Sequence, residues 1–65
     1  MKLTDNEKRA LARWYLGGVE ALRTPAYSAA TSTVSALVRK GLADKHGMTQ
    51  QGREIGKELA DSGIV

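Results

Sequence analysis

The sequence predicts a small, mostly α-helical domain that carries a short two-stranded β hairpin in its second half. An amphipathic helical run ends at Gly41, which can supply the left-handed residue that follows a helix. Residues 42–48 allow only two short strands and a tight turn, most naturally at His46-Gly47. Thr49 is a favourable N-cap for another helix. This order is typical of the back half of a winged helix-turn-helix, a fold that mostly holds one helix against DNA.

The first predicted element is a helix over residues 4–16. Thr4 and Glu7 have the spacing of a capping box, which satisfies free amides at the start of a helix. Gly17-Gly18 ends the pattern. The aromatic pair Trp14-Tyr15 follows the apolar face, so we interpret it as core rather than as a stacking surface for a ligand.

Two further helices are predicted before Gly41. A short one over 18–23 points Val19 and Leu22 inward. Pro25 breaks the chain and is well suited as the first residue of the next helix, predicted over 26–40. The inward stripe of that helix consists of Ala30, Val34, Leu37 and Val38.

The last predicted helix spans 49–61, and small residues such as Gly52 and Gly56 share its apolar face. Small residues allow close helix approach, although each glycine costs about 1 kcal/mol relative to alanine. The predicted core comprises Leu11, Trp14, Val34, Leu37, Val38, Leu42, Ile55 and Leu59.

Composition limits the class of protein. A chain of 65 residues predicts a single domain over 1–65 that buries only ~60% of its unfolded surface. The absence of cysteine excludes disulfides and thiolate metal sites and suits the cytoplasm, where we expect the protein. We expect no signal peptide and no contact with a membrane. The net charge of +3 permits nucleic-acid binding without requiring it.

One stretch carries a family resemblance. Residues 37–42 (Leu-Val-Arg-Lys-Gly-Leu) and 48–53 (Met-Thr-Gln-Gln-Gly-Arg) resemble the "L-x-x-K/R-G-L-V … L-T-x-x-G-R" signature of MarR-like and related bacterial winged-helix domains. Residues 32–35 (Ser-Thr-Val-Ser) are similar to the start of the recognition helix, although they lie closer to Gly41 than in that family. The resemblance covers roughly 4–60 and implies a small bacterial or phage regulator that binds double-stranded DNA. The family's long dimerisation helices are absent, so at most a weak homodimer is expected.

The candidate DNA-reading surface follows from helical spacing. Short hydroxyl side chains let a helix lie deep in the major groove, and Arg39 can reach a guanine or a phosphate. Cations at the helix end and the hairpin tip can contact phosphates. The candidate residues are Ser28, Thr31, Ser32, Ser35, Arg39, Lys40, Lys45 and His46. From the residues alone a merely solvated face is slightly favoured, and the resemblance reverses that order.

Two functions remain open. The sequence has no phosphate-binding glycine loop and no nucleophile–base arrangement, and His46 is its single histidine. We therefore expect no enzyme, no cofactor and no metal. The first function is a transcriptional regulator that reads the major groove with the helix around 28–40. The alternative is an interaction module that docks on a host or partner protein without binding DNA.

Overall fold

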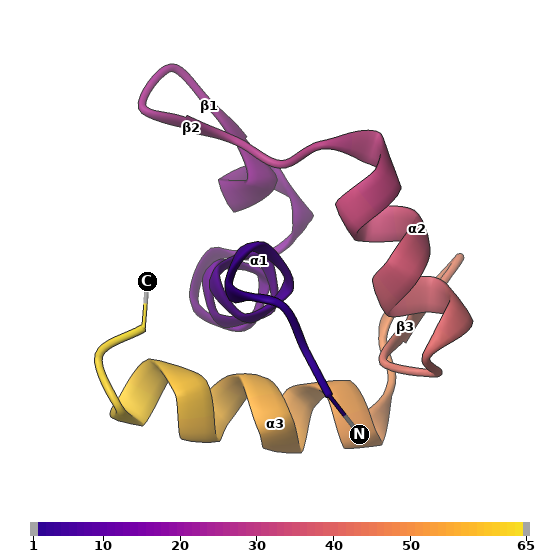
Figure 1. Cartoon of the computed structure of the whole chain (residues 1–65). Coiled ribbons are helices and arrows are strands. Elements are labelled where there is room, and N and C mark those ends of the chain that lie inside the picture. Colours follow the sequence, from indigo (N-terminus) through magenta and orange to yellow (C-terminus); the bar gives the residue numbers. More distant parts are fainter. Residues whose placement is uncertain (1, 65) are drawn as a thin grey trace.

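The computed structural model describes residues 2–64, which form three α-helices, one 3₁₀ helix and two antiparallel hairpins (Figure 1). The elements in chain order are α1 (Asp5–Gly17), η1 (Val19–Leu22), β1 (Arg23–Thr24), β2 (Tyr27–Ser28), α2 (Thr31–Arg39), β3 (Ala43–Asp44), β4 (Gly47–Met48) and α3 (Gln50–Asp61). The mostly helical fold with a small hairpin is therefore confirmed. None of the helices in this range combines the length and apolar composition needed to cross a lipid bilayer.

Helix α1 is the centre of the arrangement. Figure 1 views it nearly end-on, with α3 below it, α2 beside it and the β1–β2 hairpin above it. The elements α2, α3 and η1 all pack against α1. The two hairpins lie near opposite ends of α2, which therefore runs along the outside of the molecule between them (Figure 1).

The predicted caps of α1 are confirmed. The Thr4 hydroxyl accepts from the amide of Glu7 at 3.2 Å, and the Glu7 carboxylate accepts from the amide of Thr4 at 2.8 Å. These two bonds satisfy amides that have no partner inside the helix. The helix ends where Gly18 adopts a φ of 77°, which a residue with a Cβ rarely reaches.

The segment between α1 and α2 differs from the prediction. The predicted helix over 18–23 is a single 3₁₀ turn, and the helix predicted over 26–40 begins only at Thr31. The residues between them form the β1–β2 hairpin. The Thr24 hydroxyl accepts from the amide of Tyr27 at 3.0 Å and donates to its carbonyl at 3.1 Å, which closes the turn. Pro25 therefore occupies the turn rather than starting a helix.

The end of α2 and the second hairpin follow the prediction closely. The amide of Leu42 donates to the Leu37 carbonyl and that of Gly41 to the Val38 carbonyl, which is a Schellman ending. Strands β3 and β4 pair in antiparallel register. The turn lies at Lys45-His46, one residue earlier than predicted. It forms there because the Asp44 carboxylate accepts from the amide of His46 at 2.7 Å.

Helix α3 begins at Gln50, directly after the predicted N-cap Thr49. The Thr49 hydroxyl accepts from the amide of Gly52 at 3.1 Å. Gly52 and Gly56 are buried, and both lie against backbone or side-chain atoms of neighbouring elements. A Cβ on Gly52 would overlap the carbonyl oxygen of Leu42, and one on Gly56 would lie 2.9 Å from the Cβ of Tyr15. Small residues on this face are therefore required for close packing.

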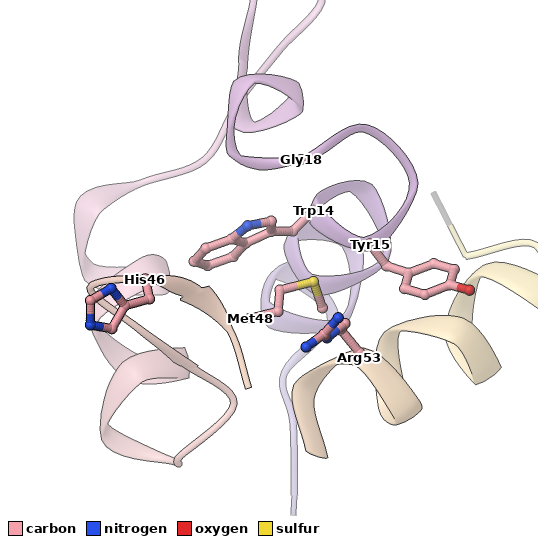
Figure 2. Close-up of a pocket in the computed structure, with 6 residues that line it drawn as sticks. All are labelled: Trp14, Tyr15, Gly18, His46, Met48 and Arg53. Carbon is pink, nitrogen blue, oxygen red and sulfur yellow. The ribbon is translucent and has the colours of Figure 1, made fainter. Parts of the chain in front are cut away.

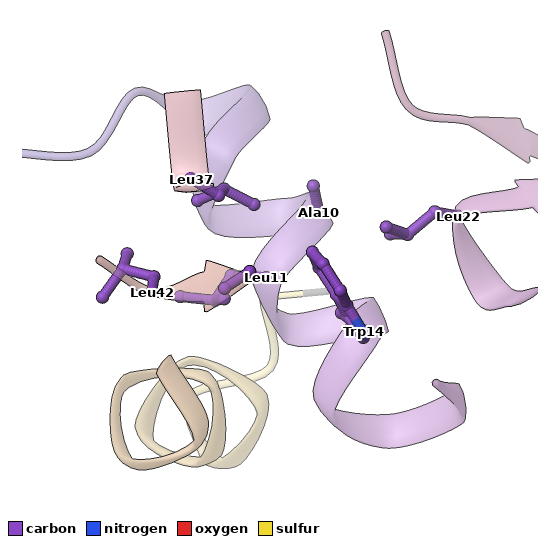
Figure 3. Close-up of a cluster of buried hydrophobic side chains, with 7 residues drawn as sticks. Ala10, Leu11, Trp14, Leu22, Leu37 and Leu42 are labelled. Atoms are coloured by element: carbon purple, nitrogen blue, oxygen red, sulfur yellow. The ribbon is translucent and has the colours of Figure 1, made fainter. Parts of the chain in front are cut away.

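The core collects around α1, with two exceptions to the prediction. Its buried members are Ala10, Leu11, Trp14, Leu22, Leu37, Leu42 and Ala43, most of them labelled in Figure 3, and Val34, Ile55 and Leu59 pack against them partly buried. The predicted core residue Val38 is 45% exposed and Val19 is 57% exposed. Helix α2 packs on α1 and β3, and Val38 projects about 100° around the helix from Leu37, away from both.

Candidate nucleic-acid interface

Helix α2 presents one continuous exposed face. Four of the predicted site residues share it with Val38, and together they occupy an arc of about 120° centred on Ser35. Leu37 lies on the opposite side of the helix and is fully buried in the core. We call this surface the α2 face; its members are Thr31, Ser32, Ser35, Val38 and Arg39, all exposed.

Lys40 lies outside the α2 face, although it was predicted to contact DNA. Its Nζ donates to the Glu7 carboxylate at 2.7 and 2.9 Å and to the carbonyl of Lys2 at 2.9 Å. The hydrogen bond from Lys40, followed by the backbone hydrogen bond from Thr4, lowers the pKa of Glu7 below its usual value. The ion pair of Lys40 with Glu7 therefore links the end of α2 to the start of α1.

Ser28 is also placed differently from the prediction, because it belongs to β2 and not to the reading helix. It nevertheless lies close to α2, since only a groove of about 310 Å³ separates the hairpin from the helix. The register of the hairpin pairs Ser28 with Arg23, which helical spacing did not predict as a site residue. We call this the hairpin groove; it is lined by Val19, Leu22, Arg23, Ser28, Ala29, Thr31, Val34 and Ser35.

The β1–β2 hairpin is held in place by contacts on both of its sides. The amide of Ala29 donates to the carbonyl of Leu22 at 2.9 Å, and the Leu22 side chain is buried in the core. On the other side, the guanidinium carbon of Arg13 lies 4.3 Å from the centre of the Tyr27 ring, a cation–π contact. These contacts join residues from separate elements, so local sequence patterns did not reveal them.

At the other end of α2, Lys45 and His46 are exposed at the tip of the β3–β4 hairpin, as predicted. His46 also borders a cavity of about 370 Å³ between the end of α1, this hairpin and the start of α3 (Figure 2). Arg53 lines the same cavity and is a second cation that the sequence analysis did not select. The remaining lining residues are Trp14, Tyr15, Gly18 and Met48.

The arrangement leaves several cations available to a ligand. Within residues 2–64 the only ion pair is that of Glu7 with Lys40, so Arg23, Arg39, Lys45 and Arg53 have no carboxylate partner there. Arg39 lies on the α2 face, Arg23 lines the hairpin groove and Lys45 lies at the tip of the β3–β4 hairpin, an arrangement suited to a polyanion. No protein-family model matches the chain, and neither a curated protein nor a solved structure matches it.

Proposed function

We propose that this protein binds double-stranded DNA as a small winged-helix regulator of the MarR-like type, with α2 in the major groove and the β3–β4 hairpin as the wing. The observation that carries the proposal is the α2 face, which offers hydroxyl groups and an arginine with no ion pair within residues 2–64. The helix is anchored from behind by Leu37 and Lys40. A transcriptional role in a bacterium or phage, in the cytoplasm, fits this activity best.

The dimensions and chemistry of α2 suit the major groove. An α-helix with its side chains is about 10–12 Å across, which matches the major-groove width of about 12 Å. Ser32 and Ser35 can approach base edges or phosphates closely because their side chains are short. Val38 offers methyl groups of the kind that contact the thymine methyl, and Arg39 can donate two hydrogen bonds to one guanine.

The helix that usually precedes a recognition helix is represented here by η1 and the β1–β2 hairpin. Two features support the winged-helix assignment despite this difference. The chain order is α2, a short hairpin and α3, and both helices pack against α1. The short β3–β4 hairpin reaches a phosphate backbone through Lys45 more readily than the floor of a minor groove.

Replacement of Arg39 tests the proposal. A duplex selected from a random-sequence pool by the parent protein is the probe, and fluorescence anisotropy measures its affinity. Arg39→Ala should weaken binding by ~1–3 kcal/mol if Arg39 reads a guanine, and much less for an unrelated duplex. Arg9→Ala removes the same charge from an exposed position on α1. It should leave the difference in affinity between the selected and the unrelated duplex unchanged.

Circular dichroism should show that Arg39→Ala folds as the parent does, because the side chain points away from the core. The triple variant with Ser32, Ser35 and Arg39 changed to Ala provides the strictest comparison. If it stays folded and binds the selected duplex as tightly as the parent, α2 does not read DNA.

Val38 favours a second function, docking on a protein partner. An exposed valine at the edge of a recognition surface is also what a protein interface uses. The α2 face carries a single cation, Arg39, because the neighbouring Lys40 is paired with Glu7. In this case a partner captured from nuclease-treated bacterial lysate should be lost with Val38→Asp and retained with Arg9→Ala. Steeply salt-dependent binding to duplex DNA, abolished by the triple variant, would argue for the first function instead.

A further inference from the structure

The hairpin groove combines a cation with hydroxyl groups and an apolar floor. Arg23 is exposed, and its side chain has neither an ion pair nor a hydrogen bond within residues 2–64. Ser28 lies opposite it in the hairpin register, and Thr31 and Ser35 line the groove from α2. The floor is apolar because Leu22 and Val34 lie beneath these groups.

These groups match the chemistry of one strand of a nucleic-acid backbone. A guanidinium pairs well with a phosphate, and serine and threonine hydroxyls are common donors to phosphate oxygens. A deoxyribose presents mainly carbon and hydrogen atoms, which suit an apolar floor. Thr31 and Ser35 belong to both the groove and the α2 face, so a duplex seated on α2 brings a backbone strand next to the groove.

We propose that the hairpin groove seats one sugar–phosphate strand of the duplex, with Arg23 paired to a phosphate and the hydroxyls of Ser28 and Thr31 donating to its oxygens. This inference rests on the proposed function, since it assumes that α2 enters the major groove. It gives the β1–β2 hairpin a role in the affinity for any sequence, while the α2 face supplies the discrimination between sequences.

The hairpin is suited to this role because its position is already fixed in the free protein. The Thr24 hydroxyl closes its turn, Leu22 anchors its base in the core, and Tyr27 packs under Arg13. Little chain ordering is then required on binding, so that more of the interaction between Arg23 and a phosphate appears as affinity.

The test compares Arg23→Ala, Arg23→Lys and Arg9→Ala in anisotropy titrations over a series of salt concentrations. The probes are the selected duplex and an unrelated duplex of the same length. Arg23→Ala should weaken both about five- to tenfold near 0.1 M salt and reduce the slope of log K against log salt by about one unit. Arg23→Lys should keep most of that slope, and Arg9→Ala should keep all of it.

A deoxynucleoside monophosphate and inorganic phosphate serve as separate probes. Their binding is detected by the amide chemical shifts of Ala29 and Ser35. The duplex should change these amide chemical shifts at concentrations at which neither small anion has an effect. This inference is overturned if either small anion saturates the groove as readily as the duplex does. It is also overturned if Arg23→Ala behaves as Arg9→Ala does while Arg39→Ala still weakens the selected duplex. If the parent binds no duplex, the proposed function and this inference are both overturned.

Discussion

Glu7 is the one charged residue within 2–64 that is buried, and its environment explains how this is tolerated. A buried carboxylate is costly unless its oxygens accept hydrogen bonds and a cation lies beside it. Glu7 accepts from Lys40 and from the amide of Thr4. One side chain therefore completes the N-cap of α1 and also holds the end of α2.

The environment of Glu7 predicts how stability depends on pH. The pKa of Glu7 is lower in the folded protein than in the unfolded chain. The stability that the ionised carboxylate contributes is therefore complete above the pKa of the unfolded chain, and it is lost as pH falls through the pKa of the folded protein. The thermal midpoint of the parent should therefore fall as pH is lowered below about 5, where carboxylates begin to titrate. Glu7→Gln should lower the midpoint at pH 7 and flatten this acid dependence, as measured by circular dichroism.

Two further variants separate the ion pair from the cap. Lys40→Gln removes the cation but leaves the bond between Glu7 and Thr4, and it should also reduce the acid dependence because Lys40 is the larger cause of the lowered pKa. Asp61→Asn changes an exposed carboxylate and should leave the pH profile as in the parent. A parent-like profile in Glu7→Gln would show that other carboxylates control the acid response.

At the scale of elements, the approach of α3 to the end of α2 depends on Gly52. Alanine is normally favoured over glycine within a helix by about 1 kcal/mol. At position 52 the added Cβ would overlap the carbonyl oxygen of Leu42, a backbone atom that cannot move aside alone. Gly52→Ala should therefore destabilise the protein by ~1–3 kcal/mol or more, measured by urea denaturation.

Gln51→Ala is the matched control, since Gln51 is exposed on the same turn of α3. Its change in stability should stay within about 0.5 kcal/mol. If Gly52→Ala is as stable as this control, α3 does not lie against the Leu42 carbonyl.

The elements also show what local sequence patterns can predict. The cap at Thr4, the Schellman ending at Gly41 and the N-cap of α3 at Thr49 are determined by neighbouring residues, and all three are confirmed. The β1–β2 hairpin was missed because its stability comes from the Thr24 side chain and from the contact of Tyr27 with Arg13. None of these is a typical hairpin signal such as Asn-Gly.

The candidate site was predicted less completely than the fold, because more of it depends on contacts between separate elements. Helical spacing correctly grouped Ser32, Ser35 and Arg39 on one exposed face. It could not reveal that Lys40 pairs with Glu7, a residue in another helix, or that the hairpin brings Arg23 beside Ser28. Such pairings depend on the tertiary arrangement, which periodicity within one element does not contain.

At the scale of the whole molecule, the core is small and each of its large members matters. A chain of this length is expected to be stable by only about 3–10 kcal/mol. Leu37 is fully buried, and Leu37→Ala should cost ~2–5 kcal/mol, enough to populate the unfolded state strongly. Urea denaturation of Leu37→Ala measures the loss. Val38→Ala, one residue along the same helix, should change the midpoint little because Val38 is exposed.

An equal loss in both variants would mean that α2 is rotated about its axis. Val38 would then face the core, and the α2 face would have different members.

The closure of the β3–β4 hairpin at its base also bears on how this protein can change. The Thr49 hydroxyl donates to the carbonyl of Gly41 at 2.7 Å and the Thr49 amide to that of Leu42 at 3.1 Å, so the segment between α2 and α3 is tied where it leaves the scaffold. Its tip at Lys45-His46 projects beyond that tie. Extra residues at the tip carry a small entropic cost, about 0.6 kcal/mol for each doubling of loop length. Insertions there can lengthen the hairpin while the helices stay in place, which gives evolution and protein engineering a site for altering reach independently of folding.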